Sequence, residues 1–100
     1  MREVLVRIER SRARHKKYTA IVRSKTTGRT RRVNFGDSRY AQYMDRTPLR
    51  AFTAKDHRNV ARRRNYFRRH SGVASKSQAL RRERASGKYT PKLLSHMYLW

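Results

Sequence analysis

The sequence predicts an α+β fold: a small N-terminal antiparallel β-sheet, then a basic central helix and a short apolar C-terminal helix. Apolar residues alternate at a period of two through residues 3–35, with turn residues between the runs. Beyond residue 52 the apolar spacing becomes that of helices. The 100 residues predict a single small basic domain, 1–100, and its core is thin because only 36% of the residues are hydrophobic.

The hairpin of residues 16–35 is predicted from two strand-like runs. KKYTAIVRS alternates, and TRRVNF is the returning strand. Between them KTTGR forms a turn in which Gly28 can take a positive φ. One face of the hairpin then carries the apolar residues Tyr18, Ala20 and Val22.

Residues 3–10, EVLVRIER, can add a third antiparallel strand. The period of two places Val4, Val6 and Ile8 on one face and Leu5 on the other. The basic connector 11–17 would join this strand to the hairpin.

Residues 37–52 are predicted to be irregular or to hold one short helical turn. Phe35-Gly36 closes the hairpin, and Pro48 disfavours a continuous helix through the segment. Its apolar residues are expected to lie over the sheet.

The central helix is predicted over Asp56–His70, with Thr53 as N-cap, Asp56 at the acidic capping-box position and Gly72 as the stop. Its apolar stripe, centred on Phe67, is narrow, and arginines occupy almost all of its remaining circumference. A helix this basic cannot bury itself well within a small domain, so the sequence predicts anionic partners.

The C-terminal part is predicted to contain a connector and a last helix. Residues 71–89 are small, polar and basic, and we expect a partner to mould them, although a helix over 75–84 can form. Thr90-Pro91 supplies an N-cap and a first-turn proline for the helix in PKLLSHMYLW. Its apolar side chains can either close the domain's own core or dock on a neighbouring subunit.

The charge balance sets the functional expectation. There are 28 Lys and Arg against 6 Asp and Glu, and the net charge is +22. Such a surface suits either acidic protein surfaces or nucleic acid. The candidate partner- or phosphate-binding residues are Arg10, Arg12, Arg14, Lys16, Lys17, Arg31, Arg32, Arg58, Arg62, Arg64, Arg68 and Arg69. The candidate aromatic and apolar packing residues are Tyr18, Phe35, Tyr66, Phe67, Leu94 and Trp100.

Catalytic and metal-binding patterns are weak. His57 and His70 do not have the i, i+4 spacing of zinc ligands, and no cysteine is present. Asp45 and Asp56 are the one carboxylate pair that a metal-dependent nuclease could use, but in so basic a chain we expect both to hold arginines. We therefore expect no enzymatic activity, no cofactor and no metal. No apolar run approaches the length of a membrane span, so no membrane span is expected.

Several short motifs, taken in order, resemble a family of small basic proteins of large eukaryotic double-stranded DNA viruses. They are Lys17-Tyr18-Thr19-Ala20-Ile21, Phe35-Gly36, Tyr43, Asp45, Asp56, Arg63, Tyr66, Arg69-His70, and Leu94-Ser95 through Leu99-Trp100. Residues 71–89 depart from the family pattern, being rich in Ser and Arg.

The resemblance implies a structural virion component but brings no biochemical activity with it. The expected function is that of a minor capsid protein, bridging or lining the inner face of the capsid shell through arginine-rich surfaces. The implied partners are other capsid proteins, major and minor, with contact to packaged DNA or to RNA. The implied location is the capsid interior, and the host cytoplasm during assembly. The alternative is a nucleic-acid-binding protein, either a genome-associated virion protein or a ribosomal protein.

Overall fold

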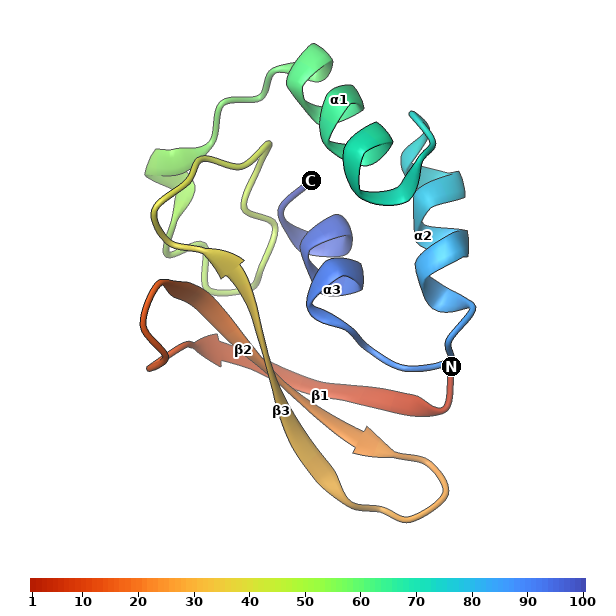
Figure 1. The fold of residues 1–100 in the computed structure, drawn as a ribbon. Helices are drawn as coiled ribbons and strands as arrows, with labels where there is room; N and C mark the ends of the chain where they lie inside the picture. Colours follow the sequence, from red (N-terminus) through yellow and green to blue (C-terminus); the bar gives the residue numbers. More distant parts are fainter.

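The computed structural model describes residues 1–100 and confirms the predicted α+β fold. Three antiparallel strands form one sheet in the order β1-β2-β3, and three helices follow; in Figure 1 the helices lie on one side of the sheet, with α3 next to it. The elements are β1 Glu3–Arg10, β2 Lys16–Ser24, β3 Thr30–Asp37, the short 3-10 helix η1 Thr53–Lys55, α1 Val60–Ser71, α2 Lys76–Arg84 and α3 Pro91–Tyr98.

The core lies between the hairpin and α3. Antiparallel pairing joins β2 to β3, and Gly28 has the positive φ of 73° that the turn requires. The buried cluster consists of Tyr18, Ala20, Val22, Val33, Phe35, Leu94 and Leu99. The C-terminal apolar residues therefore close the domain's own core, which was the first of the two alternatives above.

Strand β1 forms, but the predicted assignment of its faces is wrong. The pairing register with β2 shifts between Leu5 and Arg7, so Val6 forms a β-bulge. Beyond a bulge the alternation of faces is displaced by one residue. As a result Leu5 and Ile8 pack against the core, whereas Val6 is 41% exposed.

Segment 38–59 contains no α-helix and is held by a buried polar network. The Asp45 carboxylate accepts hydrogen bonds from the Tyr18 hydroxyl and from the backbone nitrogens of Thr47 and Phe52, the latter two at 3.0 and 3.1 Å. The Thr47 hydroxyl donates a further bond of 2.7 Å. One buried carboxylate thus ties the irregular segment to the central strand of the sheet.

A second carboxylate continues this network. Oδ1 of Asp56 accepts from the Gln42 side-chain amide and from the backbone nitrogen of Asp45, each at 2.7 Å. The backbone nitrogens of His57 and Arg58 donate to the carbonyl oxygens of Gln42 and Tyr43. Residues 56–58 are therefore paired side by side with residues 42–43.

This pairing makes the predicted start of the central helix wrong. The helix begins at Val60 rather than Asp56, and its N-cap is Asn59, whose side chain accepts from the Arg62 backbone nitrogen at 3.0 Å. Arg58 has a φ of 52°, which interrupts any helix through it. Thr53 instead opens the short 3-10 helix η1.

The other predicted helix ends are confirmed. Gly72 ends α1 in the left-handed conformation, with φ 71°. The Thr90 hydroxyl accepts from the Leu93 backbone nitrogen at the start of α3. Helix α2 forms within the connector 71–89, and its Ala79 is buried against Tyr66 and Phe67 of α1.

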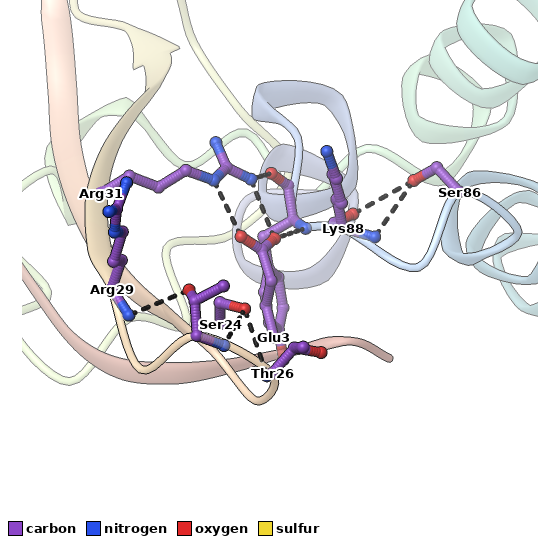
Figure 2. A network of polar contacts seen from close by, with 9 residues as sticks. Glu3, Ser24, Thr26, Arg29, Arg31, Ser86 and Lys88 are labelled. Atoms are coloured by element: carbon purple, nitrogen blue, oxygen red, sulfur yellow. Dashed lines mark hydrogen bonds and ion pairs between the residues drawn. The ribbon is translucent and has the colours of Figure 1, made fainter.

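Figure 2 shows how Glu3 joins the start of the chain to its last third. Its carboxylate accepts two hydrogen bonds from the Arg31 guanidinium, at 2.8 and 2.9 Å, and one of 2.8 Å from the Tyr89 backbone nitrogen. Arg31 also donates to the Tyr89 carbonyl oxygen at 2.7 Å. Glu3 is buried and thus connects β1, β3 and the segment entering α3.

Replacing Glu3 with glutamine should lower the free energy of unfolding by about 2 kcal/mol, since hydrogen bonds to a charged group are among the stronger ones. The bond from Arg31 lowers the pKa of Glu3, so this stabilisation is present above pH 4.5, the unfolded value, and is lost as the pH falls. Urea denaturation at pH 7 measures the loss. Glu9→Gln is the control, because Glu9 also binds two arginines but at the exposed surface. An equal loss in both variants would contradict the role given to Glu3.

Candidate polyanion-binding site

The largest hollow of the molecule has a volume of about 640 Å³ and lies between the end of the hairpin, α1 and α3. Its walls are Lys16, Lys17, Phe35, Gly36, Asp37, Tyr40, Ala41, Arg62, Tyr66, Arg69, His70, Pro91, Lys92, Ser95, Leu99 and Trp100. We call it the basic hollow.

Helical spacing brings the α1 residues of the basic hollow together. Arg62, Tyr66, Arg69 and His70 stand at i, i+4, i+7 and i+8, which is one face of a helix. Tyr66 is buried at the base of this face, whereas the two arginines and His70 are exposed at its rim. Lys92 reaches the hollow from the first turn of α3.

The basic hollow carries an excess of positive charge. Asp37 is its one carboxylate, and it forms an ion pair of 2.8 Å with Arg39. The hydrogen bonds from Arg39 hold the pKa of Asp37 well below its usual range, so this carboxylate stays charged and engaged. Lys92 is 4.0 Å from Glu83, the outer limit of an ion pair.

Lys17 is a buried cation at the floor of the hollow. Its ammonium donates to the Tyr40 carbonyl oxygen at 2.9 Å and to the Gln42 side-chain oxygen. Burial, with a contribution from Lys55, lowers the pKa of Lys17 to about 8. Lys17 thus holds the wall 40–42 in place, and its donors already point into the protein.

Aromatic rings form the apolar wall. Trp100 is stacked on Tyr66, with ring centres 4.1 Å apart and planes 4° from parallel. His57 packs against Trp100 at 5.2 Å. The faces of the Trp100 indole are thus in contact with rings of the protein itself.

A buried hydrogen-bond chain supports this wall from behind. Tyr66 Oη lies 2.9 Å from His96 Nδ1, and His96 Nε2 lies 2.7 Å from the Ser71 hydroxyl. Ser71 donates its own proton to Glu83 at 3.0 Å, so it accepts from His96. His96 therefore carries its proton on Nε2, and Tyr66 donates to Nδ1. Burial lowers the pKa of His96 to about 4 and raises that of Tyr66, so both groups are neutral at pH 7.

All six carboxylates are used within the fold. Four of them form ion pairs: Glu3 with Arg31, Glu9 with both Arg7 and Arg32, Asp37 with Arg39, and Glu83 with Lys92. The other two, Asp45 and Asp56, lie in the polar network of segment 38–59. Five of the 28 lysines and arginines are thus in ion pairs, which leaves 23 without a carboxylate partner.

The structure brings together four of the candidate partner-binding residues and separates the rest. Lys16, Lys17, Arg62 and Arg69 line the basic hollow. Arg31 and Arg32 are instead ion-paired within the sheet, and Arg10 lies over the Phe52 ring at 5.2 Å. The other candidates stand elsewhere on the surface: Arg12 and Arg14 between β1 and β2, Arg58 before α1, and Arg64 and Arg68 on α1.

The candidate packing residues fall into three groups. Tyr18, Phe35 and Leu94 belong to the main core, and Phe67 is buried in the smaller cluster between α1 and α2. Tyr66 and Trp100 form the aromatic wall of the hollow.

The sequence analysis did not name Lys92 or His70 as candidate binding residues of the hollow. Lys92 stands alone in an apolar segment, and His70 was considered only as a zinc ligand. The i, i+4 spacing of Tyr66 and His70, whose rings lie 4.6 Å apart, was the signal available for the second.

The structure also shows where the candidate carboxylate pair lies and whether metal ligands gather. Asp45 and Asp56 meet through a backbone nitrogen, and both already accept several hydrogen bonds. No three His, Asp or Glu side chains gather closely enough to hold a metal ion. None of the helices has the length and apolar character required to cross a membrane.

Comparison with known proteins adds no relative: no family model, curated protein or solved structure matches this chain. The basic hollow is lined by some of the residues on which the resemblance to the viral family rests, namely Lys17, Phe35, Gly36, Tyr66, Arg69, His70, Ser95, Leu99 and Trp100. Four others, Tyr43, Asp45, Asp56 and Arg63, do not line it.

Proposed function

We propose that this protein is a structural virion component: a minor capsid protein that bridges or lines the inner face of the shell of a large DNA virus. The supporting observation is the internal use of every carboxylate, which leaves 23 cations on a 100-residue chain without a carboxylate partner. Self-repulsion among these charges opposes the folded state until another molecule supplies negative charge.

The placement of the aromatic residues favours protein carboxylates over nucleic acid as the principal partner. Proteins that bind single-stranded nucleic acid present exposed aromatic faces on which bases stack. Here Tyr66 and Phe67, the aromatic pair between the arginines of α1, are buried, and Trp100 is stacked on Tyr66. Tyr40 in the wall of the hollow is 63% exposed, but the Arg39 guanidinium lies over its ring, 5.5 Å from the centre. The basic surface thus offers charge and hydrogen-bond donors, with Tyr40 as its one largely exposed ring.

Nucleic-acid binding is the second candidate, and the basic hollow supports it. Lys16, Arg62 and Arg69 surround a concave surface, and phosphate contacts need no base stacking. Such binding would be independent of sequence and would weaken steeply with salt.

Particle fractionation separates the two candidates. We expect the protein to sediment with the shell and to remain there after nuclease digestion of the genome. A zero-length carbodiimide should cross-link Lys16 or Lys92 to aspartates and glutamates of coat proteins. Release by nuclease, with ultraviolet cross-links to nucleic acid instead, would replace the capsid proposal with the second candidate.

A charge-matched pair of variants tests the hollow itself. Lys16→Gln, Arg62→Gln and Arg69→Gln together should reduce incorporation into particles at least about tenfold, equivalent to 1.4 kcal/mol of binding free energy. The control combines Arg23→Gln, Lys25→Gln and Arg29→Gln, which removes the same charge from the exposed end of β2 and the turn after it, away from the hollow. Equal incorporation of the two triple variants would show that total charge, and not the hollow, determines binding.

A further inference from the structure

Three cations from three separate elements lie close enough to interact electrostatically on the side of α1 away from the basic hollow. Arg46 comes from segment 38–59, Arg63 from α1, and Lys76 from the first residue of α2. The Arg63 guanidinium lies over the Tyr43 ring, 4.2 Å from its centre. Arg63 and Lys76 line a second hollow of about 160 Å³, together with Val60, Arg64, Phe67, Ala74 and Ser75.

No carboxylate compensates these three charges. None of the five ion pairs of the molecule includes Arg46, Arg63 or Lys76. One guanidinium nitrogen of Arg46, Nη2, is buried and has no hydrogen-bond partner. Buried donors are almost always paired, so an unpaired charged donor in a cationic cluster indicates an absent acceptor.

The charges in the cluster also repel one another. Burial, then Arg46 and Arg63, lower the pKa of Lys76 to about 8. Burial and then Arg63 lower the pKa of Arg46. Asp56 is the one acid that acts on this group, and its Oδ1 already accepts bonds from Gln42 and from the Asp45 backbone.

We propose that Arg46, Arg63 and Lys76 form a binding site for a single phosphate group. Arg63 and Lys76 line the second hollow together, and Arg46 adds a buried donor without a partner, while a phosphate group has several strong acceptor oxygens for such donors. The N-terminus of α2 adds to the positive electrostatic potential at this site, because no acidic residue stands in its first turn. The Ser75 hydroxyl bonds to Ser77 instead of capping the helix. This site is separate from the basic hollow and does not depend on the protein being part of a capsid.

The protonation of Lys76 reports occupancy directly. Its side-chain pKa can be measured by NMR in the full-length protein, in chloride and in inorganic phosphate at equal ionic strength. A bound phosphate compensates Arg46 and Arg63, the two charges that oppose protonation, so saturation should raise the pKa of Lys76 by at least one unit. The control is the same titration in the variant that combines Lys16→Gln, Arg62→Gln and Arg69→Gln, where the rise in the pKa of Lys76 should persist because these residues line the other hollow.

A pair of variants tests whether phosphate binds at the cluster of Arg46, Arg63 and Lys76. Arg63→Gln should weaken phosphate binding at least tenfold in the same titration. Arg81→Gln removes an equal charge from an exposed position of α2 outside this hollow and should leave the affinity unchanged.

Two probes distinguish the sources of the phosphate. Inorganic phosphate represents a free or terminal phosphate, and dimethyl phosphate represents the diester of a nucleic-acid backbone. If only inorganic phosphate raises the pKa of Lys76, the site binds free or terminal phosphate. If both probes raise the pKa of Lys76, the ligand is a backbone phosphate. If phosphate leaves the pKa of Lys76 unchanged, or if Arg63→Gln and Arg81→Gln bind phosphate equally well, the proposed site is overturned.

Discussion

Asp45→Ala is expected to lower the free energy of unfolding by about 3–5 kcal/mol, which is the usual effect of removing one partner of a buried charged interaction. Asp45 is 2% exposed and accepts from the hydroxyls of Tyr18 and Thr47 and from the backbone nitrogens of Thr47 and Phe52. Alanine would leave these four donors without their acceptor, and each unpaired buried donor costs about 1–3 kcal/mol if nothing replaces it. Against a total stability of about 5–15 kcal/mol for a domain, this loss is large. Urea denaturation followed by circular dichroism measures it.

Asp37→Ala is the matched control for this prediction. It removes the same functional group, but the Asp37 carboxylate bonds only to Arg39, which is an exposed neighbour two residues away. We expect little change in its denaturation midpoint. Similar midpoints for the two variants would show that the network around Asp45 does not hold segment 38–59.

Acidification should destabilise the protein through His96. The pKa of this side chain is about 4 in the folded protein and 6.5 in the unfolded chain. Between these values the unfolded state binds more protons, so stability falls as the pH is lowered from 6.5 to 4. The 2.5-unit difference corresponds to about 3 kcal/mol, at 1.36 kcal/mol per unit. Thermal denaturation at half-unit pH intervals measures this slope.

His96→Gln tests the assignment of the slope. Glutamine has an acceptor and a donor for Tyr66 and Ser71 but does not titrate, so the variant should lose most of the pH dependence between 4 and 6.5. Some dependence should remain, because burial also lowers the pKa of His57 and of His70. A slope that His96→Gln leaves intact would assign the acid sensitivity to other groups.

Local patterns predicted the parts of the fold that local chemistry determines. The alternation around Tyr18 and the turn at Gly28 correctly gave the hairpin. Gly72 and Thr90 correctly marked a helix end and a helix start, because each acts through its own backbone or neighbouring amide groups.

The errors arose where distant residues compete for the same backbone. Asp56 fits a capping position by sequence, but Gln42 and the Asp45 backbone bind its carboxylate, and the helix starts four residues later. The bulge at Val6 left no signal in a regular alternation of apolar residues. Likewise, Arg62, Lys92 and Lys16 lie in one hollow only because α1 and α3 pack over the sheet. Residue spacing within a single helix or strand cannot predict that packing.

The hydrogen bond between Glu3 and Tyr89 also constrains the order of folding. Its two residues are 86 positions apart, and the Arg2 backbone nitrogen likewise donates to the Gly87 carbonyl oxygen. Contacts of such long range form slowly, because a large loop must close first. During synthesis β1 can already pair with β2, but the inner face of the sheet stays uncovered until Leu94 and Leu99 arrive. Truncation by a dozen residues at the C-terminus would thus leave a nascent chain that aggregates or is degraded, rather than a smaller folded domain.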